Sequence, residues 1–190
     1  MDDEPEMSED TVAGDVVTVR PERPGDEDAI AELVEAAFGS PAQARLVRAI
    51  RSSEEYIPEL ALVAELGRRV VGHVMISEAS LQDGDERHRV VTLSPLAVAP
   101  DVHGKGVGAA LVREVLARAD QRGEPLVVLE GNPTFYGRFG FEHSVPHGIR
   151  IDLPRWAPAA AAQVLCLSHY DPAIRGRVVY PPAFSDVTDG

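Results

Sequence analysis

The stretch LAVAPDVHGKGVGAALV, residues 96–112, decides the fold, because it places a glycine-rich loop between two apolar segments. Its three glycines stand at alternate positions, Gly104, Gly106 and Gly108. Glycine adopts positive φ angles and has no side chain to block a ligand, so such a loop can turn several backbone N–H groups toward one anion. The pattern predicts a phosphate-binding loop between a strand and a helix, and it leaves open which phosphate-bearing cofactor is held.

Composition narrows the class of protein. A chain of 190 residues, 44% hydrophobic and 26% charged, is typical of one soluble globular domain. The formal net charge of −13 argues against nucleic-acid binding, which uses a basic surface. No sequence window is apolar over the length of a membrane span, and the acidic start MDDEPEMSED is unlike a signal peptide. We therefore expect a cytoplasmic protein that binds neither nucleic acid nor a membrane.

The charge is uneven along the chain. Residues 1–15 carry seven acidic residues and no basic one, a composition that predicts a disordered acidic tail. Residues 16–190 are predicted to form a single domain, with a core at about 16–145 and a C-terminal extension at about 146–190. Cys166 is the only cysteine, which excludes an intramolecular disulfide and a cysteine-rich zinc site. We expect no metal site, and we interpret Cys166 as a buried, unreactive thiol.

Hydrophobic periodicity predicts the element order β-α-α-β-β-β-α-β-α-β. The two early helices cover residues 26–38 and 41–51, and the next three strands cover 61–66, 70–79 and 88–98, with 81–86 as a loop. After the glycines we expect a helix that ends at Gly123, a fully apolar strand over 125–130, a short helix from Pro133 and a strand over 139–144. This order indicates a mixed α/β fold with hairpins early and one parallel crossover late.

One interpretation of the glycine loop is a dinucleotide-binding turn. Gly104, Gly106 and Ala109 fit G-x-G-x-x-A, and Glu130 lies roughly the 20 residues further on that this fingerprint requires. However, the spacer at residues 99–103 separates the strand from the first glycine, and the chain has no room for a second mononucleotide-binding half. A Walker loop is absent from the sequence. A dinucleotide is thus the less favoured alternative.

The other interpretation starts from Pro95, which lies inside the predicted strand 88–98. Proline has no N–H for a β-ladder, so its presence indicates a bulge. A bulge would splay this strand from the strand at 126–130 and leave backbone groups of Leu96 to Val98 unpaired. An extended amide-bearing ligand could lie there as an extra strand, with a diphosphate held by the glycine loop. Pantetheine followed by a diphosphate is coenzyme A.

At these positions the sequence resembles the GNAT superfamily of N-acetyltransferases. LAVAPDVHGKGVGAAL is similar to the family's motif A, V-x-P followed by Q/R-x-x-G-x-G/A, through Val98, Pro100, His103, Gly106 and Gly108. NPTFYGRFGFE is similar to motif B, in which a tyrosine stands four places before Gly-Phe, here Tyr136, Gly140 and Phe141. The resemblance covers roughly residues 16–144 and is greatest to the small bacterial branch of predicted N-acetyltransferases.

The resemblance implies a central mixed, mostly antiparallel sheet that is splayed at the acetyl-CoA site and flanked by helices. It also implies direct transfer of an acetyl group from acetyl-CoA, the co-substrate, to a primary amine. Tyr136 would be the catalytic acid that protonates the departing thiolate. The cofactor-binding residues implied by position are Leu96, Ala97, Val98, His103, Gly104, Lys105, Gly106, Val107, Gly108, Ala109, Asn132 and Tyr136.

Some of these residues have simpler interpretations, and two positions depart from the family. Asn132 is also a good N-cap for a helix that begins at Pro133, and Tyr136 is also an ordinary core aromatic. His103 replaces the usual Gln or Arg. Thr92 and Ser94 occupy the strand positions where relatives often carry a Glu or His as general base, so water or another residue must take the proton. The candidates are Glu78, Glu130 and His88.

The acceptor is not readable from the sequence. A small-molecule amine, a peptide N-terminus or a peptide side chain would suit the chemistry, and the helices within 26–51 and the segment around Trp156 would shape its site. Because Thr92 and Ser94 offer no base, an acyl-CoA-binding module without turnover is an alternative from another functional class. We expect a monomer or a homodimer.

Overall fold

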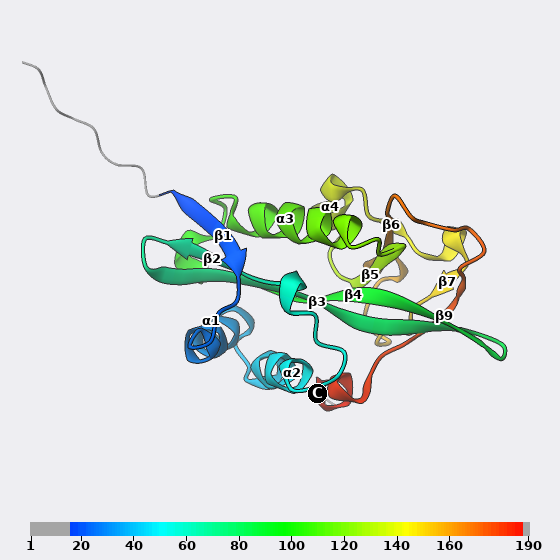
Figure 1. Ribbon diagram of the computed structural model, residues 1–190, viewed down its shortest axis with the longest axis horizontal. Helices are drawn as coiled ribbons and strands as arrows, with labels where there is room; N and C mark the ends of the chain where they lie inside the picture. The colour runs from blue at the N-terminus through cyan, green and yellow to red at the C-terminus, as the bar shows by residue number, and fades with distance from the viewer. Residues whose placement is uncertain (1–15, 188–190) are drawn as a thin grey trace, which may run out of the picture.

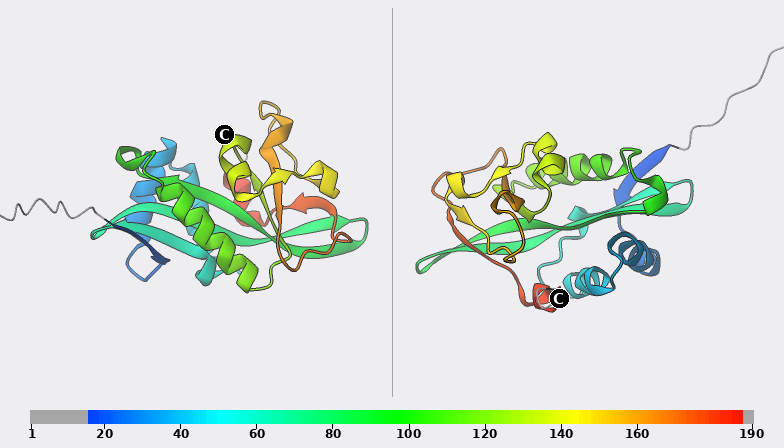
Figure 2. Two further views of the ribbon diagram at one scale, coloured as in Figure 1. Left: turned by 90° about the horizontal axis from the view of Figure 1, so that it is seen from above. Right: turned by 180° about the vertical axis from the view of Figure 1, so that it is seen from behind.

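The computed structural model describes residues 16–187, and it has a twisted sheet between two layers of helices (Figure 1). Helix α3 (Val107–Gln121) and the short α4 (Pro133–Tyr136) cover one face. Helices α1 (Glu27–Phe38) and α2 (Ala42–Arg51) cover the other face. Seen from above, α3 runs obliquely across the strands (Figure 2). The acidic stretch at 1–15 lies outside the described residues.

The sheet is mixed and mostly antiparallel, as predicted. Its first four strands are neighbours in sequence order and antiparallel: β1 (Val17–Pro21), β2 (Ala61–Leu66), β3 (Arg69–Asp83) and β4 (Glu86–Val98). Strand β5 (Leu126–Glu130) follows the α3 crossover and is parallel to β4. Leu126 to Leu129 are all buried, which explains the unbroken apolar run of this strand. The predicted element order up to residue 144 is confirmed, with the last strand reduced to β6 (Glu142–His143).

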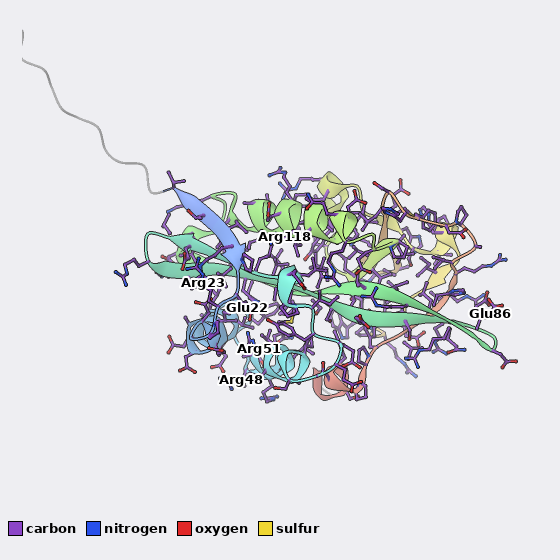
Figure 3. All side chains as sticks on the ribbon, viewed as in Figure 1. Glu22, Arg23, Arg48, Arg51, Glu86 and Arg118 are labelled. Atoms are coloured by element: carbon purple, nitrogen blue, oxygen red, sulfur yellow. The ribbon has the colours of Figure 1, made fainter. Side chains whose placement is uncertain are left out.

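The predicted loop at residues 81–86 is wrong. Strands β3 and β4 continue through this segment to a turn of two residues, because Asp83 pairs with Glu86 around Gly84 and Asp85. Gly84 has a φ of +57°, the positive angle that two-residue hairpin turns demand. The tip of the hairpin is exposed on both faces, so its sequence is polar throughout and lacks the alternation that predicts a strand. Glu86 lies at this tip in Figure 3.

The C-terminal extension adds strands to the same sheet. Strand β8 (Ala162–Cys166) lies between β5 and β6 and is antiparallel to both. Strand β9 (Gly176–Val179) pairs with β3 and with β7 (Ile149–Arg150). The chain then crosses to the face of α1 and α2, where a final 3₁₀ helix (Pro182–Val187) packs against α2 (Figure 1). The extension therefore contributes to both the sheet and one of the covering layers.

A buried polar cluster joins the residue that follows β1 to strand β3 and to helix α2. The Nε2 atom of His73, a fully buried residue of β3, lies 2.6 Å from Oε1 of Glu22, and Nε of Arg51 in α2 lies 2.9 Å from Oε2 of Glu22. Burial raises the pKa of Glu22, but the contacts with His73 and Arg51 outweigh it and lower the pKa overall. Glu22 and Arg51 are labelled in Figure 3. The cluster fixes the end of β1 and helix α2 to the centre of the sheet.

Gly72 sets how closely α3 approaches the sheet. A Cβ atom at this position would lie 2.7 Å from Cδ1 of Leu111 and 2.9 Å from Cγ1 of Val107. Leu111 is fully buried and Val107 is β-branched, so neither side chain has room to withdraw.

We therefore expect Gly72→Ala to lower the free energy of unfolding by about 1–3 kcal/mol, measured by urea denaturation. Gly137→Ala is the control, because its added Cβ meets nothing within 4 Å and its φ is −58°. That variant should stay within about 0.5 kcal/mol of the original protein. Equal stability of Gly72→Ala and the original would show that the helix can move away from the sheet at little cost.

Candidate active site

Strand β4 contains the bulge that Pro95 predicts. Val74 of β3 pairs with Leu96, whereas Ile76 pairs with Leu93, so Ser94 and Pro95 together oppose the single residue Met75. The Ser94–Pro95 peptide bond is cis. Two residues against one bend the bulged strand and interrupt its ladder.

The bulge separates β4 from β5. These two parallel strands pair only at Val91 with Val127 and Thr92 with Val128, before the bulge. The N–H of Ala99 donates to the carbonyl of Val71 in β3 at 2.9 Å. Because backbone groups alternate in direction along an antiparallel strand, the N–H and C=O groups of Leu96 and Val98 point away from β3, toward the gap. A strand edge for an extended ligand is therefore open beside residues 96–98.

One of these groups is already occupied. The Nε2 atom of His103 lies 2.9 Å from the carbonyl oxygen of Val98. A carbonyl only accepts, so Nε2 of His103 donates in this contact. The expectation that the backbone from Leu96 to Val98 is wholly unpaired is wrong for this carbonyl, because the His103 ring turns back to the end of the strand.

The glycine loop leads into a helix whose first backbone N–H groups have no helical partner. Gly104 and Gly106 have φ angles of +77° and +83°, which favour glycine over any residue with a side chain. Helix α3 begins at Val107, and the first N–H donated within the helix is that of Ala110, to the carbonyl of Gly106. The N–H groups of Val107, Gly108 and Ala109 thus have no helical partner, and the positive end of the helix dipole lies with them. This arrangement suits a phosphate group.

The strand edge and the loop share one cavity of about 520 Å³. Nine residues implied by the family resemblance line it: Leu96, Ala97, Val98, His103, Gly104, Gly106, Val107, Gly108 and Ala109. Lys105, Asn132 and Tyr136 do not belong to the lining. The lining also contains five residues that sequence reasoning missed: Ala37, Phe38, Val102, Phe135 and Arg138.

Of the missed residues, Arg138 brings a positive charge to the cavity. Its guanidinium lies 4.7 Å from the ring centroid of Phe135, and its Nε donates to the carbonyl of Phe135 at 3.2 Å. The sequence signal that could have identified Arg138 is its position inside motif B, NPTFYGRFGFE. Phe38 ends α1 and remains 43% exposed although it is large and apolar. The helical periodicity over residues 26–38 predicts the helix but could not place Phe38 beside the glycine loop.

Asn132 and Tyr136 lie next to the cavity on the far side of the gap. Oδ1 of Asn132 accepts the N–H of Thr134 at 2.9 Å, so its interpretation as a helix N-cap is confirmed. The Tyr136 ring packs edge-on against Phe135 and Phe141, and a Cβ atom on Gly131 would lie 2.5 Å from it. Burial raises the pKa of Tyr136 to about 12, so its phenol keeps its proton at neutral pH.

Two of the three candidates for the base lie in ion pairs. Glu78 accepts a hydrogen bond from Nε of Arg89 at 2.7 Å. His88 lies toward the tip of the β3–β4 hairpin, with its Nε2 3.6 Å from Oε2 of Glu86. The tip is at the opposite end of β4 from the gap (Figure 1). Neither side chain is therefore placed to meet a ligand beside residues 96–98.

Glu130, the third candidate, ends β5 at the gap. The hydroxyl of Tyr180 donates to its Oε1 at 2.9 Å. Thr92 is buried, and its side chain interacts with that of Tyr180. The C-terminal residues at this face are thus Tyr180 and its neighbours rather than those around Trp156. Trp156 is 83% exposed and does not line the cavity.

Cys166 is half-buried, not fully buried as expected. Its Sγ lies 3.6 Å from Nδ1 of His147, whose Nε2 lies 2.8 Å from Oε2 of Glu142. Burial raises the pKa of the thiol, which opposes formation of the reactive thiolate. Among residues 16–187 no group of three or more His, Cys, Asp and Glu side chains could hold a metal ion. No helix in this same range is long and apolar enough to cross a membrane.

Comparisons with known proteins agree with this geometry. Residues 18–144 match the family model of the acetyltransferase (GNAT) domain. The uncharacterized N-acetyltransferase YhbS of Escherichia coli is 36% identical over 137 residues, 72% of this chain and 80% of that protein. YjhQ of the same species, also an uncharacterized N-acetyltransferase, is 33% identical over 117 residues, which cover 62% of this chain and 65% of YjhQ.

Two solved structures are similar over most of the chain. The crystal structure of YhbS in complex with CoA has a TM-score of 0.79 at 33% identity, covering 88% of this chain and 91% of that one. A GNAT family acetyltransferase from Brucella melitensis in complex with acetyl-CoA has a TM-score of 0.73 at 29% identity, covering 90% and 100%. Sequence, fold and the two motifs therefore agree, and the chain belongs to the GNAT family of acetyltransferases.

Proposed function

We propose that this protein transfers an acetyl group from acetyl-CoA directly to a primary amine, without a covalent enzyme intermediate. The observation that carries the proposal is the continuity of the β4–β5 gap with the glycine loop in one cavity of about 520 Å³. A cavity of this size, lined by a strand edge at residues 96–98 and by a glycine loop, suits an extended amide chain that ends in a diphosphate. The CoA and acetyl-CoA bound in the two similar structures support the same assignment.

In the proposed complex, pantetheine lies along Leu96 to Val98 and pairs with the backbone groups that face the gap. One amide of pantetheine would then compete with His103 for the carbonyl of Val98. The diphosphate would accept hydrogen bonds from the N–H groups at the start of α3, with Lys105 and Arg138 as nearby cations. The side-chain N–H₂ of Asn132 is free to bind pantetheine while its oxygen caps α4.

The chemical step joins the acceptor nitrogen to the thioester carbon and breaks the bond from that carbon to sulfur. A backbone N–H of Leu96 or Val98 would stabilise the oxyanion that forms on the acetyl oxygen. Tyr136 would give its phenolic proton to the departing thiolate, for which its raised pKa of about 12 keeps the proton available at neutral pH.

The experiment that tests this function follows free thiol release from acetyl-CoA against a broad panel of primary amines. Amine-dependent release is the expected result. Binding of acetyl-CoA without release above background would instead favour an acyl-CoA-binding module, the alternative that the absence of a base at Thr92 and Ser94 keeps open. A larger rise in melting temperature with NADH than with acetyl-CoA would favour the dinucleotide interpretation.

The glycine loop can be tested at two positions with different physical reasons. Gly106 has a φ of +83°, which valine adopts only with strain, whereas a Cβ on Gly108 points toward Val98, Phe135 and Leu96 in the cavity wall. We expect Gly106→Val and Gly108→Val each to weaken acetyl-CoA binding at least 10-fold, about 1.4 kcal/mol, by isothermal titration calorimetry.

Gly123→Val is the matched control. Gly123 has a φ of +82°, nearly that of Gly106, but it lies after the other end of α3. Its replacement should cost comparable stability and leave acetyl-CoA affinity unchanged. Unchanged affinity in a folded Gly106→Val protein would show that the loop does not hold the cofactor.

The role of Tyr136 can be separated from its packing by Tyr136→Phe. The coenzyme A thiol has a pKa near the ~8.5 of cysteine, so its thiolate leaves fairly well unaided. We therefore expect kcat and kcat/KM to fall together by about 10- to 100-fold, an activation cost of about 1.4–2.7 kcal/mol. Acetyl-CoA affinity should stay the same because the ring remains packed. A folded variant within a factor of about two of the original rate would make Tyr136 a core aromatic only.

A further inference from the structure

Strand register places Glu130 at the mouth of the gap. In the parallel pair β4–β5, Thr92 lies opposite Val128. Two residues further along each strand, Glu130 is level with Ser94, the first residue of the bulge. Side chains two residues apart share one face of a strand, so Glu130 lies on the same face as Val128 and Thr92. The carboxylate therefore lies on this face of β5 at the point where the gap begins, beside the cavity rather than among its lining residues.

Tyr180 holds this carboxylate from the C-terminal extension. It follows β9 directly, and its ring stacks on Phe184 of the final 3₁₀ helix, with centroids 5.1 Å apart and planes 26° apart. That helix packs against α2, which anchors the tyrosine to the covering layer. The Tyr180 hydroxyl donates to Oε1 of Glu130 at 2.9 Å. Oε2 of Glu130 is then left to accept from another group.

The surroundings adjust Glu130 for proton transfer. Desolvation raises the pKa of Glu130, the hydrogen bond from Tyr180 opposes this, and the negative charge of Asp152 raises it further. The net rise in pKa makes the carboxylate a better base than a glutamate with the ordinary pKa. Tyr180 has its own pKa raised, chiefly by burial, so it remains a hydrogen-bond donor. Tyr136 lies close by, with its ring against Gly131.

We propose that Glu130 is the general base of the acetyl transfer and that Tyr180 is the residue that positions it. The inference rests on the proposed function. It assigns the proton acceptor that Thr92 and Ser94 cannot supply, and it gives the C-terminal extension a part in the active site.

The protons balance as follows in the proposed step. A neutral amine attacks the thioester carbon, and its nitrogen becomes acidic as the new C–N bond forms. Oε2 of Glu130 accepts the proton from that nitrogen. The C–S bond breaks, and the coenzyme A thiolate takes the Tyr136 proton. Solvent then removes the proton from Glu130 and returns one to Tyr136, so the net products are the N-acetyl amine and the free thiol.

The test compares Glu130→Gln and Tyr180→Phe with the original protein over a range of pH, with one amine found in the acceptor screen. Glu130→Gln should lower kcat/KM by about 10²- to 10⁴-fold and remove the acidic limb that Glu130 contributes to the pH profile. Tyr180→Phe removes the hydrogen bond that lowers the pKa of Glu130, so the limb should move to higher pH. Acetyl-CoA affinity should be unchanged in both variants.

Glu78→Gln and Tyr170→Phe are the matched controls. Glu78 is a glutamate of the same sheet that is paired with Arg89, and Tyr170 lies against His147, away from the gap. Both control variants should keep the original pH profile. Glu130→Asp, which retains a carboxylate, should recover part of the activity and the acidic limb even if Glu130→Gln folds poorly.

The outcomes separate this inference from the proposed function. No amine-dependent thiol release by the original protein overturns both. Turnover by the original protein with Glu130→Gln within about twofold of it, or with an unchanged acidic limb, overturns the assignment of Glu130 alone. Loss of activity in Tyr180→Phe without a shift of the limb would leave Tyr180 a structural residue and refute its positioning role.

Discussion

Ser94 and Pro95 fill the space that one residue would occupy opposite Met75, and Pro95 brings no N–H to the ladder. From this bulge onward, β4 cannot remain beside β5, and the sheet opens in its middle. Buried backbone groups need partners, so an opening inside a packed domain is tolerated only where something else satisfies them. His103 does so at one carbonyl, and in the proposed complex a ligand would do so at the other groups of the open strand edge.

The opening is locally positive, whereas the chain as a whole is negative. A formal charge of −13 would repel a phosphate-rich cofactor at long range. Locally, the start of α3 presents its positive end, and Arg138 adds a cation. Asp101, two residues before His103, is tied to Arg69 by two hydrogen bonds of 2.6 and 2.8 Å. This pairing offsets the one acidic charge nearest the loop.

Local covalent chemistry explains which features the sequence could reveal. Pro95 predicts a bulge and the alternate glycines predict an anion-binding turn, because each residue restricts the backbone by itself. Phe38, Arg138 and Tyr180 could not be assigned in the same way, since their roles depend on contacts with residues far along the chain. Strand β9 shows the limit clearly: it pairs Val179 with Ser80, 99 residues earlier, and no periodicity in either segment indicates that partner.

Strand β9 has four residues and pairs with β3 at only three positions, Ser80 to Gln82. Short strands with few paired positions open by local unfolding at a lower free energy than the centre of a sheet. Opening of this segment would withdraw Tyr180 from Glu130 while β1 to β5 stay folded. Amide hydrogens of β9 would then exchange faster than those of β1 to β5, and heating would release the segment that carries Tyr180 first. With the proposed roles of Glu130 and Tyr180, activity would be lost when β9 opens, at a lower temperature than that at which β1 to β5 unfold.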